Sequence, residues 1–496
     1  MKTITPTSIS LKQIEENDFS LSPSNYASVL IKNNNVFKLR DLLDRELNSS
    51  DKGFEIGSNC YIGESPYKFM RTKTLQAEFL LPQIDEVSTM SILPTCFKKM
   101  TLQEGDILIS KDSNIGEVAI LDRNYENYMM SGGLYKLPVS KNKHYLFGLL
   151  KTDFFKKQLH ILVSRGSTLK HAKTLFLDCR IPFPQDDKVV DFVESLVKSL
   201  INKEKIIKEK KILIEELIEK ELFSKQRNSS YKYNYPTQSE LLNNSRLDTG
   251  TYTDEFKTID YQIKNYSGGF FLIPEKDIQS GNTPSKRFIG ESSVYDYLWI
   301  TPTSITDYGT IQGTESIRCD INNLNRNALL VINRTSRGSV GEYVGVTAYY
   351  DFIHFGKGHH NQGIYRIENY PDTTLMFMSC CMNSILWRKY CAGLSLGSKM
   401  KEIKTTHLAS IPFPNFPESK VGEIADLYHK VPDERQNFQV KNPQDYLRYD
   451  GLWNQDAGIF QVYESYLKIK RLVEKIVVDI TNDDSIKIVF SIKDLY

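Results

Sequence analysis

The sequence predicts an α+β fold built from two copies of one unit, each ending in a long helix. A polar loop containing glycine, an Ile-Pro-Phe-Pro segment and a helical stretch follow one another at residues 164–223, and this order returns from residue 394 to about residue 480. Shorter matching segments precede each of these two copies, and they repeat at a similar spacing. A chain of 496 residues is too long for one hydrophobic core, so two similar units account for its length.

The overall composition is that of a folded globular protein. Hydrophobic residues make up 40% of the chain and charged residues 25%, with a formal net charge of +2. This balance argues against a strongly basic body that binds polyanions without specificity. A local basic groove is compatible with it, because electrostatic steering depends on how charge is distributed.

The cysteines and the N-terminus predict a soluble cytoplasmic protein. Seven scattered cysteines include no Cys-x-x-Cys pair, which is typical of reduced, mostly buried thiols. Residues 1–17 are polar and carry no signal peptide, and no apolar run approaches the roughly 18 residues of a membrane span.

The first unit is assigned to residues 1–185. Short strand-like runs broken by glycine, proline and asparagine dominate it. Residues 105–110 and 116–121 are predicted to be two strands joined by a polar turn, and residues 36–47 and 145–162 to be helical. Together they predict an α+β domain with a curved sheet or a partial barrel.

The first long helix is assigned to residues 186–227. Its apolar residues recur at intervals of three and four, and Glu204 and Lys211 interrupt the stripe. The stripe consists of Val190, Val193, Val197, Leu200, Ile207, Ile214 and Ile218. Because its charges are balanced, the outer face is interpreted as solvated and not as a nucleic-acid-binding face.

The second unit is assigned to residues 228–417, with a polar linker at 228–244. Residues 329–333 match 107–110, residues 338–341 match 113–116, and residues 363–366 match 133–136. Ordered matches of this kind predict a tandem duplication.

The second long helix is assigned to residues 418–481, with a polar insertion at about 431–458. It resumes on a heptad pattern, Ile459, Val462, Tyr466, Ile469, Val473, Ile476 and Ile480. Two narrowly apolar helices are expected to bury their stripes against each other as an antiparallel coiled coil. In the tail, residues 482–496, the alternating run 486–492 is predicted to be a strand that joins a sheet of the first unit.

These features resemble the DNA specificity subunit of type I restriction-modification enzymes. The resemblance rests on the strand and turn at Gly105–Gly116, the strand Ser131–Tyr135, the loop Gly166–Lys170, the Ile-Pro-Phe-Pro segment and the long helix, most of them present twice. It implies a noncatalytic subunit with two target-recognition domains, each reading one half of a bipartite DNA site, on either side of an antiparallel helix pair. The interrupted second helix and the strand-like tail depart from the family pattern.

The resemblance also implies partners in phage defence. These are double-stranded DNA, two modification (methyltransferase) subunits that bind S-adenosylmethionine, and restriction subunits that use ATP and Mg. The chain itself would hold no cofactor. Forty helical residues extend about 60 Å, enough to separate two major-groove sites by more than one helical turn of DNA.

Base reading requires polar side chains on loops at one edge of each domain, since arginine and lysine pair with guanine and asparagine pairs with adenine. In the first unit the candidates are Tyr67, Lys68, Arg71, Lys73, Lys111, Asn114, Arg165, Ser167, Thr168 and Lys170. In the second unit they are Lys286, Arg287, Arg334, Ser336, Arg337, Lys357, His360, Ser398 and Lys399. A wider set adds Tyr61, Asp112, Thr283, Thr335, His359 and Asn361. Lys170 and Lys399 are expected to contact phosphate, and ordinary solvation is the competing interpretation for every candidate.

No catalytic or metal site is predicted. The cluster of His354, His359, His360, Cys380, Cys381 and Cys391 has no compact zinc spacing and no counterpart in the first unit. Asp372, Glu402 and Lys404 match a nuclease carboxylate set only loosely. Motifs for a DNA methyltransferase, a Walker loop or a dinucleotide site are absent from the sequence.

Three alternative functions stay open. The chain could be the recognition subunit of a related phage-defence system or of a two-site methyltransferase or nuclease. It could be a protein-interaction scaffold, whose two units would lack a basic concave surface. A stand-alone enzyme is the remaining alternative.

Overall fold

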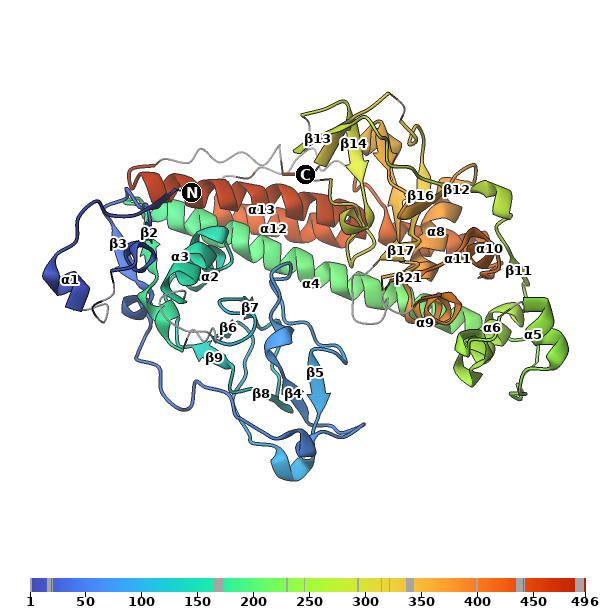
Figure 1. The fold of residues 1–496 in the computed structure, drawn as a ribbon, viewed down its shortest axis with the longest axis horizontal. Helices are drawn as coiled ribbons and strands as arrows, with labels where there is room; N and C mark the ends of the chain where they lie inside the picture. Colours follow the sequence, from blue (N-terminus) through green and yellow to red (C-terminus); the bar gives the residue numbers. More distant parts are fainter. Residues whose placement is uncertain are drawn as a thin grey trace. The chain divides into compact units, whose positions relative to one another are not determined.

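The computed structural model describes residues 2–15, 19, 21–163, 173–228, 231–244, 246–291, 294–313, 315–320, 322–335, 343–397, 400–433, 440, 442–486 and 495–496. The chain divides into two compact units. The first comprises Met1–Ile206, Glu434–Gln455 and Tyr463–Tyr496, and the second comprises Ile207–Asp433 and Asp456–Val462. Helix α4 (Asp187–Ser224) supplies its first half to one unit and its second half to the other (Figure 1).

The part of the first unit that the structure describes forms four small sheets. Two have three strands, in the orders β5-β4-β8 and β7-β6-β9, and two are the pairs β1-β2 and β3-β10. The strands are β1 (Thr3–Ile4), β2 (Ser28–Val29), β3 (Val36–Lys38), β4 (Lys68–Met70), β5 (Thr89–Ser91), β6 (Ile107–Ser110), β7 (Val118–Ile120), β8 (Tyr128–Met130), β9 (Leu134–Leu137) and β10 (Arg180–Pro182). The other helices in this unit are α1 (Leu11–Glu15), α2 (Lys143–Leu150), α3 (Asp153–Val163), most of α12 (Pro443–Asp456) and most of α13 (Ile459–Asn482).

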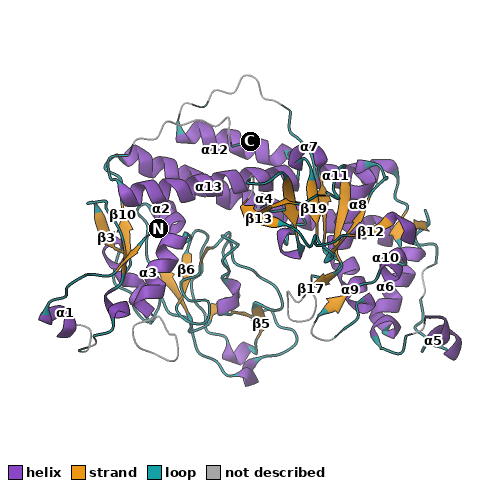
Figure 2. Ribbon diagram, turned by 45° about the horizontal axis from the view of Figure 1, so that its top comes forward, coloured by secondary structure: helices purple, strands orange, loops and turns teal. Residues whose placement is uncertain are grey.

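The described residues of the second unit form two four-stranded sheets and two strand pairs, and Figure 2 draws the strands in orange. The orders are β12-β20-β16-β18, β13-β15-β14-β19, β11-β22 and β17-β21. The strands are β11 (Phe270–Phe271), β12 (Ile278–Ser280), β13 (Phe288–Glu291), β14 (Tyr297–Ile300), β15 (Glu315–Arg318), β16 (Ala328–Ile332), β17 (Arg334–Thr335), β18 (Thr347–Tyr350), β19 (Gly358–His360), β20 (Ile364–Ile367), β21 (Lys401–Glu402) and β22 (Phe413–Pro414). The helices are α5 (Gln238–Asn244), α6 (Asp254–Lys264), α7 (Phe352–Phe355), α8 (Asp372–Asn383), α9 (Ile385–Leu394), α10 (Thr405–Ala409) and α11 (Glu418–Tyr428).

The strand pairing of the two units shows the predicted duplication. The parallel pair β4–β8 aligns Phe69 with Met129, and the parallel pair β14–β19 aligns Trp299 with His359. Strand β6 lies between β7 and β9, as β16 lies between β18 and β20. Strands β9 and β20 cover the predicted match of residues 133–136 with 363–366. The match of 338–341 with 113–116 falls partly outside the described residues.

The first half of α4 packs with α12 and α13 into a buried helical core beside the sheets of the first unit. The predicted apolar positions of α4 and α13 are all buried, which confirms both stripes. The backbone N–H of Gln185, just before α4, donates to Asp484, just after α13, over 2.7 Å. Since Glu204 also lies close to Tyr466, α4 and α13 run antiparallel, as the periodicity predicts.

Glu204, the first of the two stripe-breaking residues, attaches α4 to the sheet-bearing part of the first unit. It is 1% exposed, and its carboxylate accepts hydrogen bonds from the backbone N–H groups of Leu80 (2.7 Å) and Leu81 (3.1 Å). Buried polar groups need such partners. The interruption in the apolar pattern therefore marks a domain attachment.

Lys203 forms a second polar centre inside the first unit. Its Nζ lies 2.7 Å from Asp450 Oδ1 and 2.6 Å from Asn454 Oδ1 on α12. The rings of Trp453 and Tyr496 lie 4.8 and 5.0 Å from the same nitrogen. These contacts hold α12 against α4, with no exposed surface left on Lys203.

Several predictions about local structure are wrong. Residues 36–47 are not a helix: they form β3, which pairs with β10, and a 3-10 turn at Leu39–Leu42. The polar insertion at 431–458 contains helix α12. The predicted tail strand at 486–492 lies almost wholly outside the described residues. None of the described helices combines the length and apolar character that a membrane crossing requires.

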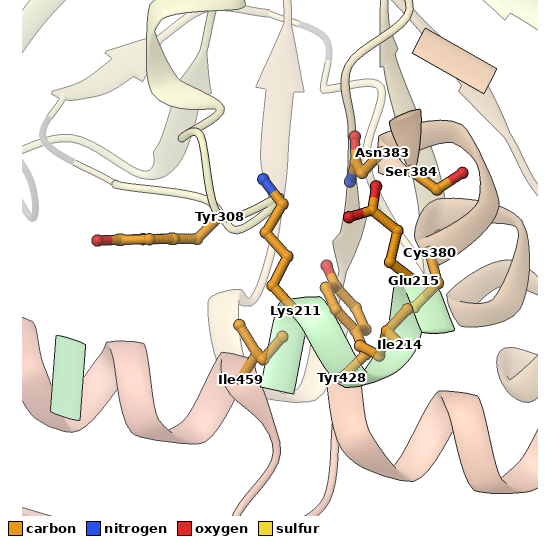
Figure 3. Close-up of a pocket in the computed structure, with 9 residues that line it drawn as sticks. All are labelled: Lys211, Ile214, Glu215, Tyr308, Cys380, Asn383, Ser384, Tyr428 and Ile459. Atoms are coloured by element: carbon orange, nitrogen blue, oxygen red, sulfur yellow. The ribbon is translucent and has the colours of Figure 1, made fainter. Parts of the chain in front are cut away.

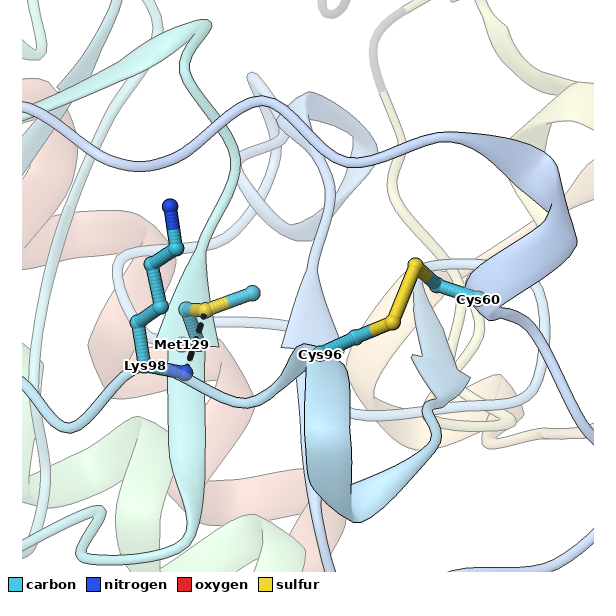
Figure 4. Close-up of a disulfide and its surroundings, with 4 residues drawn as sticks. All are labelled: Cys60, Cys96, Lys98 and Met129. Atoms are coloured by element: carbon cyan, nitrogen blue, oxygen red, sulfur yellow. Dashed lines mark hydrogen bonds between the residues drawn. A yellow bond between two sulfur atoms is a disulfide. The ribbon is translucent and has the colours of Figure 1, made fainter.

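One cysteine pair also differs from expectation. Cys60 and Cys96 form a disulfide that joins two 3-10 turns of the first unit, close to the backbone hydrogen bond from Lys98 to Met129 Sδ (Figure 4). The expectation that all seven cysteines are reduced is therefore wrong for these two. The pair was not predicted because its cysteines are 36 positions apart and form no short Cys motif. The other five are free thiols.

Candidate nucleic-acid interface

In the first domain, polar side chains gather where strands β4, β6 and β8 end. A Cβ at Gly133 would lie 2.7 Å from Thr72 Cγ2, so this glycine allows the loop after β8 to touch the loop after β4. The backbone N–H of Lys111 donates to Gly133 over 2.9 Å, and Asn114 Nδ2 donates to the Leu75 carbonyl over 3.1 Å. We call these three segments, residues 71–75 after β4, 111–117 after β6 and 131–133 after β8, the loop edge of the first domain.

The loop edge brings together four predicted candidates, Arg71, Lys73, Lys111 and Asn114. Lys73 is exposed, whereas the other three are partly exposed. Lys111 forms an ion pair with Asp112, so part of its charge is already compensated. This edge therefore presents cationic and amide groups side by side. Such groups donate hydrogen bonds to base edges and to phosphates.

The second domain has an equivalent loop edge. The N–H of Asn333, after β16, donates to Gly363 over 3.0 Å, just as Lys111 donates to Gly133. A Cβ at Gly363 would lie 2.8 Å from Pro302 Cγ, which repeats the contact of Gly133 with Thr72. Asn333 is itself buried, and its Nδ2 donates to the Gln362 carbonyl over 3.0 Å.

A two-stranded ribbon extends from this second loop edge. Strands β17 and β21 pair antiparallel, with Arg334 opposite Glu402 and Thr335 opposite Lys401. Glu402 also exchanges two backbone hydrogen bonds with Leu396, of 2.8 and 2.9 Å. Lys401 is not among the candidates predicted from the sequence, because Lys399 is the first lysine of the repeated glycine-serine loop.

Gly397 permits the turn that leads into the ribbon. Its φ is +98°, and an added Cβ would lie 2.2 Å from the Met400 carbonyl oxygen. Only glycine adopts this conformation readily. The glycine of the repeated loop motif thus has a backbone role in the second domain.

The ribbon borders a buried tyrosine. Burial raises the pKa of Tyr365 on β20, and the nearby Glu402 raises it further while Arg334 lowers it. Arg334 and Glu402 therefore act on one neighbouring group, as expected for residues on the same face of the ribbon.

His360 lies inside the second domain. It is 0% exposed, and burial lowers its pKa to about 3, which keeps the ring neutral. His359 is equally buried, stacks on Trp299, and its Nε2 lies 3.0 Å from the Asn282 carbonyl oxygen. A side chain without exposed surface cannot contact DNA, so the predictions for both histidines are wrong.

Other candidates lie away from the loop edges. Tyr67 and Lys68 stand at the opposite end of β4, where Tyr67 and Phe97 line a cavity of about 500 Å³. Lys357 precedes β19 at the corresponding end in the second domain. Lys286 and Arg287 precede the edge strand β13.

Eight candidates lie outside the described residues: Arg165, Ser167, Thr168, Lys170, Ser336, Arg337, Ser398 and Lys399.

Within the second unit, a cavity shows how α4 is attached to this domain (Figure 3). Lys211, the second stripe-breaking residue, donates from Nζ to the Asp307 carbonyl over 3.1 Å, and the Glu215 carboxylate accepts from the Ile385 N–H over 2.6 Å. The Tyr428 hydroxyl donates to the Gly309 carbonyl over 2.5 Å. These bonds use the polar groups of the cavity for packing, so we assign it no ligand.

No group of three or more His, Cys, Asp or Glu side chains suited to a metal ion occurs in the part of the chain that the structure describes.

Comparison with known protein families finds one similarity, which covers part of the first half of the chain. Residues 31–216 match the profile of the type I restriction modification DNA specificity domain. No curated protein matches the sequence.

Fourteen chains of solved structures match this chain, among them the following three, all at low sequence identity. The type I restriction-modification system S subunit from M. genitalium is 13% identical, with 92% of this chain and 98% of that chain covered and a TM-score of 0.40. The HsdS subunit from Thermoanaerobacter tengcongensis is 13% identical, with coverages of 86% and 95% and a TM-score of 0.24. A chain solved in work on complex assembly and conformational transition of the type I R-M system is 11% identical, with coverages of 92% and 99% and a TM-score of 0.29.

Proposed function

We propose that the chain is the DNA-recognition subunit of a type I restriction-modification system, because residues 31–216 match the profile of the type I restriction modification DNA specificity domain. The observation that carries this proposal is the duplication: the matched domain has a second copy in the same chain, with equivalent strands and an equivalent loop edge. Each copy would read one half of a bipartite site.

The chain directs chemistry and does not perform it. Members of the specificity family recognise DNA, while the catalytic activity lies in partner subunits. We expect two modification subunits to bring S-adenosylmethionine and to methylate adenine, and restriction subunits to use ATP and Mg. The helices that join the domains would set the distance between the two half-sites, since 38 residues of α4 extend about 57 Å.

Domain exchange tests the proposal. The chain is co-expressed with the modification subunits encoded beside it, in a host without adenine methylation, and methylated adenines are mapped across the genome. Replacing residues 1–185 or 245–417 by those of a related chain should change one half of a bipartite motif and leave the other half intact. Methylation that neither replacement alters would refute the proposal.

A salt titration separates DNA recognition from a scaffold function. Neutralising phosphates releases counterions, so the affinity of the assembled complex for duplex DNA should fall steeply as salt increases. A scaffold that binds polypeptides predicts no such slope for DNA. The matched control is the same set of modification subunits without this chain.

A further inference from the structure

The two loop edges differ in one connection, and this difference points to the element that reads bases. In the first domain, residues 110–117 connect the paired positions Ile109 and Val118 of β6 and β7. In the second domain, residues 332–346 connect Val331 and Thr347 of β16 and β18, so this connection is seven residues longer. Its first residues form β17, which has no counterpart among the described strands of the first domain.

We propose that the ribbon of β17 and β21 is the element with which the second domain reads the major groove. A two-stranded antiparallel ribbon fits the major groove of B-DNA. Strand β21 leads directly into the core, because the N–H of Ile403 donates to the Asn333 carbonyl over 2.8 Å and Ile403 is buried. This inference rests on the proposed DNA-recognition function.

The anchoring of the ribbon supports a reading role. Asn333, at its base, is held by three hydrogen bonds, from its N–H to Gly363, from its Nδ2 to Gln362, and from Ile403 to its carbonyl. Beyond this base, Arg334, Thr335 and Lys401 are partly exposed, and Glu402 is exposed. A rigid base with polar groups beyond it meets the requirement that reading groups be preorganised.

The chemistry of the ribbon favours a G·C pair. Arg334 and Glu402 lie opposite each other, so their side chains share one face. Arginine donates to O6 and N7 of guanine, and glutamate accepts from N4 of cytosine. Thr335 and Lys401 form the other pair and are suited to phosphate contacts, which position the protein without reading sequence.

The test uses the methylation assay described above, with the full chain and its modification subunits. Arg334→Ala and Glu402→Ala should each reduce preference for the cognate base pair about tenfold or more, at one position in the half-site that belongs to the second domain. Arg334→Lys keeps the charge but loses the planar fork, and should relax the same position.

The matched control is Arg326→Ala. Arg326 is an exposed cation of the same domain that precedes β16, at the end of this strand opposite to the ribbon, and it is not among the DNA-binding candidates. This variant should leave the recognised sequence unchanged. Thermal unfolding of each complex checks that the substitutions leave the fold intact, and Arg334→Lys is the reading variant least prone to disturb it.

The outcomes separate the two proposals. A bipartite motif that stays the same in all three ribbon variants overturns the ribbon proposal alone, as does a motif that changes only with Arg326→Ala. A parent chain whose motif ignores domain exchange overturns the DNA-recognition function, and the ribbon proposal with it.

Discussion

Replacing Lys203 by methionine is expected to destabilise the first unit by about 3 kcal/mol. Lys203 and Asp450 are 0% and 1% exposed and lie 2.7 Å apart. Removing one partner of a buried ion pair costs about 3–5 kcal/mol, because the other charge is left uncompensated. The Tyr496 hydroxyl (2.8 Å) and Asn454 Nδ2 (2.9 Å) still donate to Asp450, which places the expected value at the lower end.

Hydrogen–deuterium exchange against urea measures this effect locally, in peptides that cover residues 196–206 and 443–455. A local readout is needed because a chain of two units need not unfold in one step. Adding Asp450→Asn to Lys203→Met removes the stranded charge and should recover part of the loss. Lys198→Met is the control on the same helix, since the partly exposed Lys198–Glu194 pair should contribute below about 1 kcal/mol. Equal losses for Lys198→Met and Lys203→Met would refute the reasoning.

Three further predictions concern other contacts. Glu204→Ala should cost about 2–4 kcal/mol in the same exchange assay, because two buried N–H groups lose their acceptor; a loss below 1 kcal/mol would contradict this. The hydrogen bond from His429 lowers the pKa of Asp351, although burial opposes it, so the folded state binds fewer protons than the unfolded chain in acid. This stabilisation is complete above about pH 5, starts to decline below the ordinary aspartate pKa of about 3.9, and is lost as the pH falls through the lower pKa of folded Asp351. Thermal unfolding of Asp351→Asn between pH 6 and 3 should therefore show a weaker acid dependence than the parent. Reductant should lower the parent's unfolding midpoint, because the disulfide closes a loop of 36 residues and contributes up to about 4 kcal/mol, and it should leave a Cys60→Ser, Cys96→Ser double variant unaffected.

Periodicity predicted the starts of the helices well because a buried stripe repeats over many turns. The predicted start of α4 at residue 186 lies one residue from Asp187. Helices α11 and α13 begin at Glu418 and Ile459, the two positions where helical sequence was predicted to begin and to resume. Helix α12 was missed because half of its buried face is polar. Asp450 and Asn454 share that face with Tyr446 and Trp453, so no apolar repeat marks it.

The interface was predicted less well, since strand ends are set by tertiary pairing. Arg71 and Lys68 are three residues apart, but they stand at opposite ends of β4. Polar composition assigned His360 to a loop, whereas it ends the buried strand β19. Lys401 escaped notice because only its pairing with Thr335 places it on the ribbon.

The first unit is assembled from segments at both ends of the chain, and this affects the order in which the chain folds during synthesis. Asn33 donates from Nδ2 to the Ile480 carbonyl over 2.7 Å, a bond between residues 447 positions apart. The ribosome therefore releases the N-terminal sheets of the first unit long before α12 and α13 exist to cover the apolar stripe of α4. The second unit, mostly the continuous segment Ile207–Asp433, is complete sooner. The first unit, whose synthesis starts first, should thus be the last to complete its fold. A nascent chain stalled before residue 443 should expose the apolar stripe of α4 to chaperones.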